Sequence, residues 1–124
     1  MNSVQLLGRL TADPELRYTQ SAEPVAIAKF TLAVPRRKVR DKPQETDFFN
    51  VIAWRNKAEF AERHLRKGQR IAIRGELQAR NYTDKDDVKR WVVEVVAEDI
   101  YFADGKADGP SSTPDGDLPW DGQQ

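Results

Sequence analysis

The 124-residue chain contains no cysteine. Disulfide bonds, thiol nucleophiles and cysteine-ligated zinc sites are therefore excluded, and the composition fits a reducing cytosol. No apolar run approaches the roughly 18 residues that a membrane span needs. The first residues, Met-Asn-Ser-Val-Gln-Leu-Leu, lack the basic region and long apolar stretch of a secretory signal. These absences predict a cytoplasmic protein without a leader or a membrane anchor.

Histidine occurs only once, at His64. No cysteine can join it in a catalytic triad or a metal site, and glycine-rich phosphate-binding motifs are also missing. A site built from carboxylates alone would have to use Asp13 and Glu15, in a predicted turn, or the acidic residues of the loop at 84–87. Carboxylates in such places are usually only solvated. We therefore expect no enzymatic activity, no cofactor and no metal site.

A net charge of zero conceals an uneven distribution of charge along the chain. Residues 103–124 hold five Asp and one Lys, whereas residues 1–102 hold 19 basic and 15 acidic side chains. From Ala103 onward the composition also changes to Asp, Gly, Pro, Ser and Thr. We predict a mildly basic folded domain over residues 1–103 and a disordered acidic tail over residues 104–124.

Runs of strand-forming residues dominate the domain, with one change of period. The predicted strands cover residues 4–10, 25–34, 46–54, 70–80 and 90–102. Between the third and fourth strands, Ala58, Ala61 and Leu65 form a narrow helical stripe within residues 55–67. Three strands, one helix and two strands is the order of an OB-fold, a five-stranded, partly open barrel that binds oligonucleotides. We predict this all-β fold, with its helix between strands three and four.

Aromatic residues mark one face of the third predicted strand. Side chains alternate along a strand, so placing Phe49, Val51 and Ala53 inward leaves Phe48 and Trp54 outward. The two rings would lie about 20 Å apart at 3.3 Å per residue. Outward rings in a basic groove are typical of sequence-tolerant binding to single strands, because bases stack on rings while cations neutralise phosphates. In the alternative, the parity is reversed and Trp54 plugs the end of the barrel.

Two further aromatic residues belong to the last two strands and the loop between them. Tyr82 opens the predicted loop at 81–89, beside Arg80. It is either a third stacking ring or a tyrosine that shields the base of the loop. Trp91 alternates with Val93 and Val95, which favours packing in the core.

Cations gather in the predicted loop at residues 35–45. Five of them fall within seven residues and would repel one another in the absence of a polyanion, with Asp41 as the only counterweight. They are Arg36, Arg37, Lys38, Arg40 and Lys42. Three more cations, Arg70, Arg74 and Arg80, share one face of the fourth strand, where a charged side chain is usually just solvated.

Taken together, these residues resemble the bacterial single-stranded DNA-binding protein family over about residues 2–103. The resemblance is carried by the order and spacing of residues 7–18, 30–34, 47–54, 64–68, 75–82 and 94–96. It implies an OB-fold, usually assembled as a homotetramer, that wraps single-stranded DNA around aromatic and basic groups. It further implies roles in DNA replication, recombination and repair, in the cytoplasm and at the nucleoid of a bacterium, with a phage or plasmid origin left open.

The resemblance also assigns roles by position. Phe48, Trp54 and Tyr82 fall where the family places base-stacking aromatics, and Arg80 falls at a basic position. The family often has another aromatic near residues 37–39, where this chain has none, so we expect more phosphate contact and greater salt sensitivity there. The expected DNA-binding residues are Phe48, Trp54, Tyr82, Arg36, Arg37, Lys38, Arg74 and Arg80.

The tail resembles the acidic tip of the family, which ends in Pro-Phe and docks on replication and repair proteins. The expected partner-binding residues are Asp117, Leu118, Pro119, Trp120 and Asp121. Here the aromatic residue is not terminal, and Asp121 would replace the negative charge of the chain end. In the alternative, the tail only adds solubility and shields the groove. A second alternative for the whole chain is an OB-fold interaction module, such as a replication-restart accessory, that meets nucleic acid incidentally.

Overall fold

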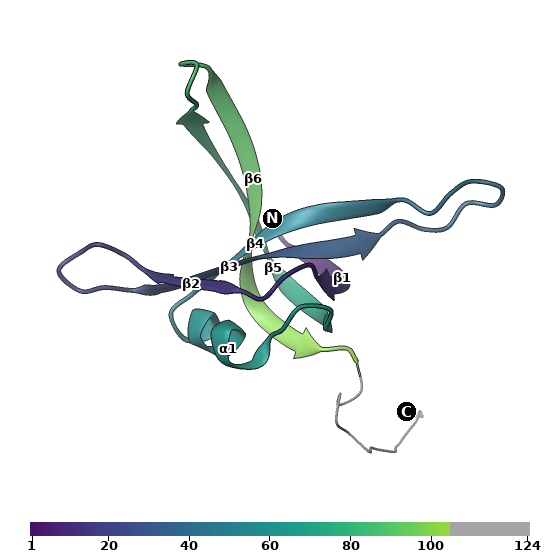
Figure 1. Ribbon diagram of the computed structural model, residues 1–124, viewed down its shortest axis with the longest axis horizontal. Coiled ribbons are helices and arrows are strands. Elements are labelled where there is room, and N and C mark those ends of the chain that lie inside the picture. The colour runs from purple at the N-terminus through teal and green to yellow at the C-terminus, as the bar shows by residue number, and fades with distance from the viewer. Residues whose placement is uncertain (105–124) are drawn as a thin grey trace.

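In the computed structural model, which describes residues 1–104, the chain folds into a six-stranded sheet with one helix (Figure 1). The elements are β1 (Val4–Leu10), β2 (Glu15–Tyr18), β3 (Ala26–Pro35), β4 (Thr46–Trp54), α1 (Asn56–His64), β5 (Arg70–Thr83) and β6 (Lys89–Phe102). The predicted all-β fold with a single helix after the Thr46–Trp54 strand is confirmed.

The sheet curves strongly enough for β1 to pair with β3 and close it into a barrel. Its strand order is β1-β5-β6-β4-β3-β2, and β1 also pairs with β3 through Arg9↔Ala33 and Leu10↔Leu32. All neighbouring strands are antiparallel except β4 and β6, which run parallel through two residue pairs. This closing contact makes the sheet a small barrel, with β2 added outside it.

Glycines allow the strands to approach closely where the barrel bends. A Cβ atom on Gly8 would lie 2.3 Å from the carbonyl oxygen of Ala33, at the contact between β1 and β3. A Cβ atom on Gly75 would lie 2.1 Å from the carbonyl oxygen of Val96, where the register of β5 and β6 shifts. Any side chain at these two positions would force the strands apart.

The core lies inside the barrel and under α1. Every second side chain of β3 from Ala26 to Leu32 is buried, and the same alternation buries Val51 and Ala53 of β4, as expected of a sheet with one apolar face. The predicted burial of Ala58, Ala61 and Leu65 is confirmed, since all three side chains are fully buried, although Leu65 follows the last residue of α1. The buried apolar residues are Leu10, Ala26, Ala28, Phe30, Leu32, Val51, Ala53, Ala58, Ala61, Leu65, Ile71, Ile73, Val95 and Ala97.

The structure departs from the predicted elements in three places, of which the first is that α1 ends at His64 and not at residue 67. Glu15, which we placed in a turn, begins a strand instead: Glu15–Tyr18 pair with β3 as β2. Four residues are too few to show a clear alternation of apolar and polar side chains. The hairpin between the last two strands is also longer than predicted, because pairing continues to Thr83↔Lys89. Figure 1 shows this β5–β6 hairpin and the β3–β4 hairpin projecting from the body of the barrel.

Among the described residues, no helix is long and apolar enough to cross a membrane.

Candidate nucleic-acid interface

Two aromatic rings of β4 point out of the barrel. Phe48 is 64% exposed and Trp54 is 42% exposed, whereas Val51 and Ala53 are fully buried. Phe49 is half-buried on the inward side. The predicted parity is therefore confirmed, and Trp54 does not plug the interior.

Polar side chains separate the two rings. In the register of β3 and β4, Lys29 lies opposite Ile52 and Thr31 lies opposite Asn50, and the Thr31 hydroxyl donates to Asn50 Oδ1 at 3.1 Å. Lys29 was not among the site residues predicted from the sequence. The sequence pattern could have identified Lys29, because it is the one charged residue of β3 and lies at an outward position between two buried residues.

The β5–β6 hairpin continues the same side of the sheet. Ile52 of β4 lies beside Val96 of β6, so the even-numbered side chains of β6 up to Val96, before the register shift, share the side that carries Phe48 and Trp54. Arg80 and Tyr82 of β5 pair with even-numbered residues of β6 and therefore face the same way. We call this side of β3, β4, β6 and β5 the outer face. It has a ring at each end of β4 and the Arg80–Tyr82 pair on the projecting hairpin.

Tyr82 belongs to β5 and not to the loop in which we had placed it. Its side chain is 47% exposed, and the guanidinium carbon of Arg80 lies 6.0 Å from the centre of its ring. This distance is within the range of a cation–π contact. The ring remains open to solvent on the outer face.

The expectation that Trp91 packs in the core is wrong. Trp91 is 70% exposed and Val93 is 57% exposed, whereas Val95 is 1% exposed. The alternation was read correctly, since these side chains do point to the core side of the sheet. The barrel ends near Val95, however, and beyond it no residue among 1–104 covers that side of the hairpin. Leu77, opposite Val95 on β5, is likewise 42% exposed.

The arginine at the base of the basic loop already has anionic partners. Arg36 donates to both carboxylate oxygens of Asp47 at 2.9 Å and to Glu45 at 3.1 Å. These contacts raise the pKa of Arg36, and the hydrogen bond from Arg36 lowers the pKa of Asp47. Asp41 is the only acidic residue among the seven positions that hold the five cations, and Glu45 and Asp47 add negative charge at the base of the loop. Arg36 holds the start of the loop in place, and a phosphate would have to compete with the Asp47 and Glu45 carboxylates for its guanidinium group.

The other cations of the loop are less engaged. The Lys38 ammonium donates to the carbonyl oxygen of Lys42. Within residues 1–104, the Arg37 and Arg40 side chains make no ion pair or hydrogen bond. The loop therefore offers Arg37 and Arg40, which are exposed, as its uncommitted cations.

Arg74 and Arg80 are also paired, in different surroundings. Arg74 bonds to Asp99 and to Glu98, and its pKa is raised chiefly by the hydrogen bond to Asp99. It lines a surface groove together with Leu7 and Tyr101, near β1, away from Tyr82. Arg80 bonds to Glu94, which raises the pKa of Arg80. Each arginine has an aromatic residue nearby: Tyr101 lines the same groove as Arg74, and Tyr82 lies beside Arg80.

The acidic hairpin turn is partly neutralised. Asp84 accepts hydrogen bonds from the backbone N–H groups of Asp86 and Val88 and from Arg90 Nε at 2.8 Å. The bond from Arg90 is the main reason that the pKa of Asp84 is lowered. This carboxylate holds the turn in shape, which gives the acidic loop a structural role.

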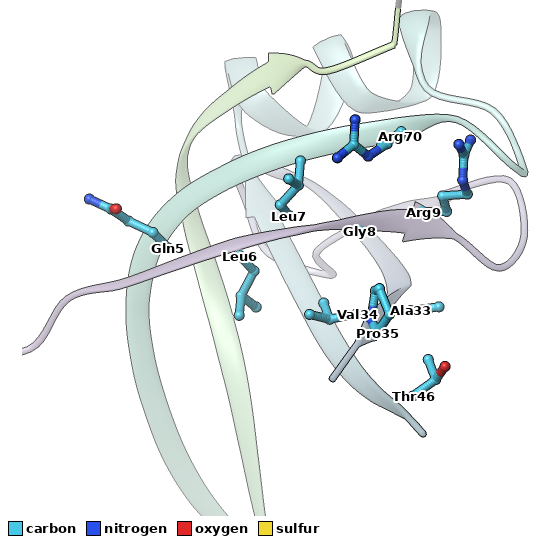
Figure 2. A pocket seen from close by; sticks show the side chains of 10 residues that line it. All are labelled: Gln5, Leu6, Leu7, Gly8, Arg9, Ala33, Val34, Pro35, Thr46 and Arg70. Carbon is cyan, nitrogen blue, oxygen red and sulfur yellow. The ribbon is translucent and has the colours of Figure 1, made fainter. Parts of the chain in front are cut away.

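A second surface feature lies along the free edge of β1. A groove of about 550 Å³ runs beside this strand (Figure 2). In Figure 2, Leu6 and Val34 lie on one side of the β1 ribbon, and Leu7 and Arg70 lie on the other side. Beyond Gly8 toward the chain start, β5 is the one strand within residues 1–104 that pairs with β1, so the other edge of β1 can accept another strand.

Within residues 1–104, no cluster of three or more His, Asp or Glu side chains could hold a metal ion. The predicted tail beyond Asp104 lies outside the described residues, and so do its expected partner-binding positions. These are Asp117, Leu118, Pro119, Trp120 and Asp121.

Comparison with known proteins adds a family and named relatives. Residues 1–103 match the model of the "Single-strand binding protein family". The chain is 43% identical over 102 residues to "Single-stranded DNA-binding protein 3" of Clostridium acetobutylicum, covering 82% of this chain and 70% of the relative. It is 46% identical over 110 residues to "Single-stranded DNA-binding protein 3" of Listeria innocua, covering 88% and 68%. It is 39% identical over 119 residues to "Single-stranded DNA-binding protein 2" of C. acetobutylicum, covering 96% and 89%.

Proposed function

Because the chain belongs to the single-strand binding protein family, we propose that it binds single-stranded DNA with little regard to sequence. The observation that carries this proposal is the exposure of Phe48 and Trp54 on one side of β4. Two separated rings on an open sheet face suit unstacked bases, whereas a duplex keeps its bases stacked on one another and presents mainly phosphates.

The mechanism has no chemical step. Cations first attract the strand, and the affinity falls with salt at a log–log slope of about −0.7 per phosphate neutralised. Bases then stack on Phe48, Trp54 and Tyr82, each ring contributing roughly 1–3 kcal/mol by alanine substitution. Lys29, Arg37 and Arg40 can bind phosphate without giving up a carboxylate, whereas Arg36, Arg74 and Arg80 would be shared between their carboxylate partners and the DNA.

We assign the chain to the protection of single strands during DNA replication, recombination and repair in the bacterial cytoplasm. Residues 1–103 form the DNA-binding domain, and residues 104–124 form an acidic tail whose tip, at 117–121, recruits partner proteins. Deletion of residues 117–124 should leave the DNA affinity unchanged or slightly higher while abolishing partner capture. Capture that survives the deletion would refute the docking role.

We further propose assembly into a homotetramer. Two uncovered surfaces support it: the open edge of β1 beside the groove in Figure 2, and the apolar stripe of Leu77, Val93 and Trp91 on the β5–β6 hairpin. Burying such surfaces against other copies would remove apolar area from water. Light scattering of the full chain tests the assembly, and a monomer at micromolar concentration would contradict it.

The DNA-binding proposal is tested by titrating the full chain with oligo-dT. Binding is followed by the anisotropy of a labelled oligomer and by quenching of tryptophan fluorescence. If bases stack on Trp54, dT should quench the fluorescence of the wild type more than that of Trp54→Phe. The variant can still be measured because it keeps Trp91 and Trp120. Duplex DNA of the same length should bind weakly, and an RNA oligomer measures the preference for DNA. Absence of dT binding at low salt would refute the function and leave the protein-interaction module as the better account.

A further inference from the structure

Glu94 is a charged residue buried in the outer face. It is 7% exposed and, within residues 1–104, it is the one buried polar or charged side chain. Burying a carboxylate is costly unless a cation and hydrogen bonds compensate it. The mechanism proposed above gives this residue no role.

The partner of Glu94 is Arg80. Arg80 Nε donates to Glu94 Oε1 at 2.9 Å, and Arg80 Nη2 donates to Glu94 Oε2 at 3.4 Å. The Arg80 side chain is itself 53% exposed. A guanidinium group has five N–H donors in a fixed plane, so two bonds to Glu94 leave three donors free. The free edge can accept a phosphate or a base while the other edge stays attached.

The surroundings of this pair belong to the outer face. Glu94 lines a groove of about 400 Å³ together with Lys29, Asn50 and Ile52. On the other side of the pair, the Arg80 guanidinium lies beside the ring of Tyr82. The buried carboxylate therefore stands between the β4 rings and the ring of the projecting hairpin.

We propose that Glu94 is a positioning residue for DNA binding, which holds the Arg80 guanidinium beside Tyr82 before the strand arrives. This inference rests on the proposed function. A free arginine side chain loses rotamer entropy when it binds a phosphate, and this loss weakens binding. An arginine anchored in advance has already lost that freedom during folding. Glu94 thus improves binding to an anion although it is itself an anion.

The sign of one substitution distinguishes positioning from simple electrostatics. Glu94→Gln removes a negative charge from the DNA-binding face, so long-range electrostatics alone predicts tighter binding. Positioning predicts the opposite, a loss of about three- to tenfold in dT affinity, which corresponds to the cost of ordering one long side chain. The matched control is Glu98→Gln, which removes the same charge from the same strand while Arg74 keeps its bond to Asp99. The control should bind as tightly as the wild type or slightly more tightly.

A second pair of measurements tests whether Glu94 affects DNA affinity through Arg80. In an Arg80→Gln background, Glu94→Gln should cause no further loss of dT affinity. Arg80→Lys retains the charge on an exposed side chain and so folds even if Glu94→Gln does not. The lysine ammonium lacks the planar fork, so this variant should lose a similar factor in affinity at an unchanged salt slope.

The inference is overturned if Glu94→Gln binds dT as tightly as Glu98→Gln, or if Arg80→Lys binds like the wild type. It also fails if the losses from Glu94→Gln and Arg80→Gln simply add. Failure of the proposed function looks different, because the wild type itself would then not bind dT or Phe48→Ala would bind unchanged. Normal wild-type binding that is lost in Phe48→Ala but kept in Glu94→Gln removes only the role of Glu94.

Discussion

Replacing Phe48 with alanine should separate DNA affinity from stability. The ring is 64% exposed, so only about a third of its surface is covered in the folded protein. A fully buried aromatic side chain covers roughly 150–250 Å². The covered third therefore amounts to roughly 50–90 Å², or about 1–2 kcal/mol of stability as an upper estimate. Loss of base stacking should cost about 1–3 kcal/mol of binding free energy, which raises the Kd roughly 5- to 150-fold.

The matched control is the same substitution at Phe30. Phe30 is 6% exposed in the barrel core, so Phe30→Ala should cost about 3–5 kcal/mol of stability. Urea denaturation measures stability, and anisotropy of labelled dT measures affinity at a temperature where both variants are folded. We expect Phe48→Ala to lose mainly affinity and Phe30→Ala to lose mainly stability. Equal dT affinity of Phe48→Ala and the wild type at low salt would refute the stacking role, and equal stability losses in the two variants would mean that Phe48 is packed.

Three further predictions concern the loop, the hairpin turn and the barrel bend. Replacing Arg37 and Lys38 together with Gln should make the salt dependence of dT binding shallower, by about 0.7 in log–log slope for each phosphate that is no longer neutralised, and an unchanged slope removes this loop from the interface. The pKa of Asp84 is lowered below its ordinary value of 3.8, so its contribution to stability is fully present above that pH and is lost as the pH falls through the lower folded value. The Tm difference between the wild type and Asp84→Asn should accordingly be constant above about pH 5 and shrink below 3.8, and a difference that persists in acid contradicts the pairing with Arg90. Gly75→Ala places a Cβ atom 2.1 Å from a carbonyl oxygen of β6 and should cost about 2 kcal/mol or more in thermal or urea unfolding, whereas a neutral result means that β6 can shift at no cost.

Local patterns in the sequence were sufficient for most of the fold. The apolar alternation of residues 46–54 predicted the bounds of β4 and the outward side of Phe48 and Trp54. This succeeded because a small barrel can bury only one side of a strand, so the polarity of neighbouring residues determines which side that is. The stripe of Ala58, Ala61 and Leu65 predicted the helix for a similar reason, since only one side of it meets the core. The short β2 strand had too few residues to show a period.

The tertiary structure decided what surrounds each side chain. The sequence predicted the direction of Trp91 correctly, but only the length of the barrel determines that this direction ends in solvent. Arg36 and Arg80 were expected as cations available to DNA, and the structure pairs them with Asp47 and Glu94. The second of these partners is 14 residues away in the chain and is brought close by hairpin register. Alternation is a property of neighbouring residues, so the sequence alone determined which way a side chain points. Contact is a property of strands paired across the sheet, so only the closed barrel determined what that side chain meets.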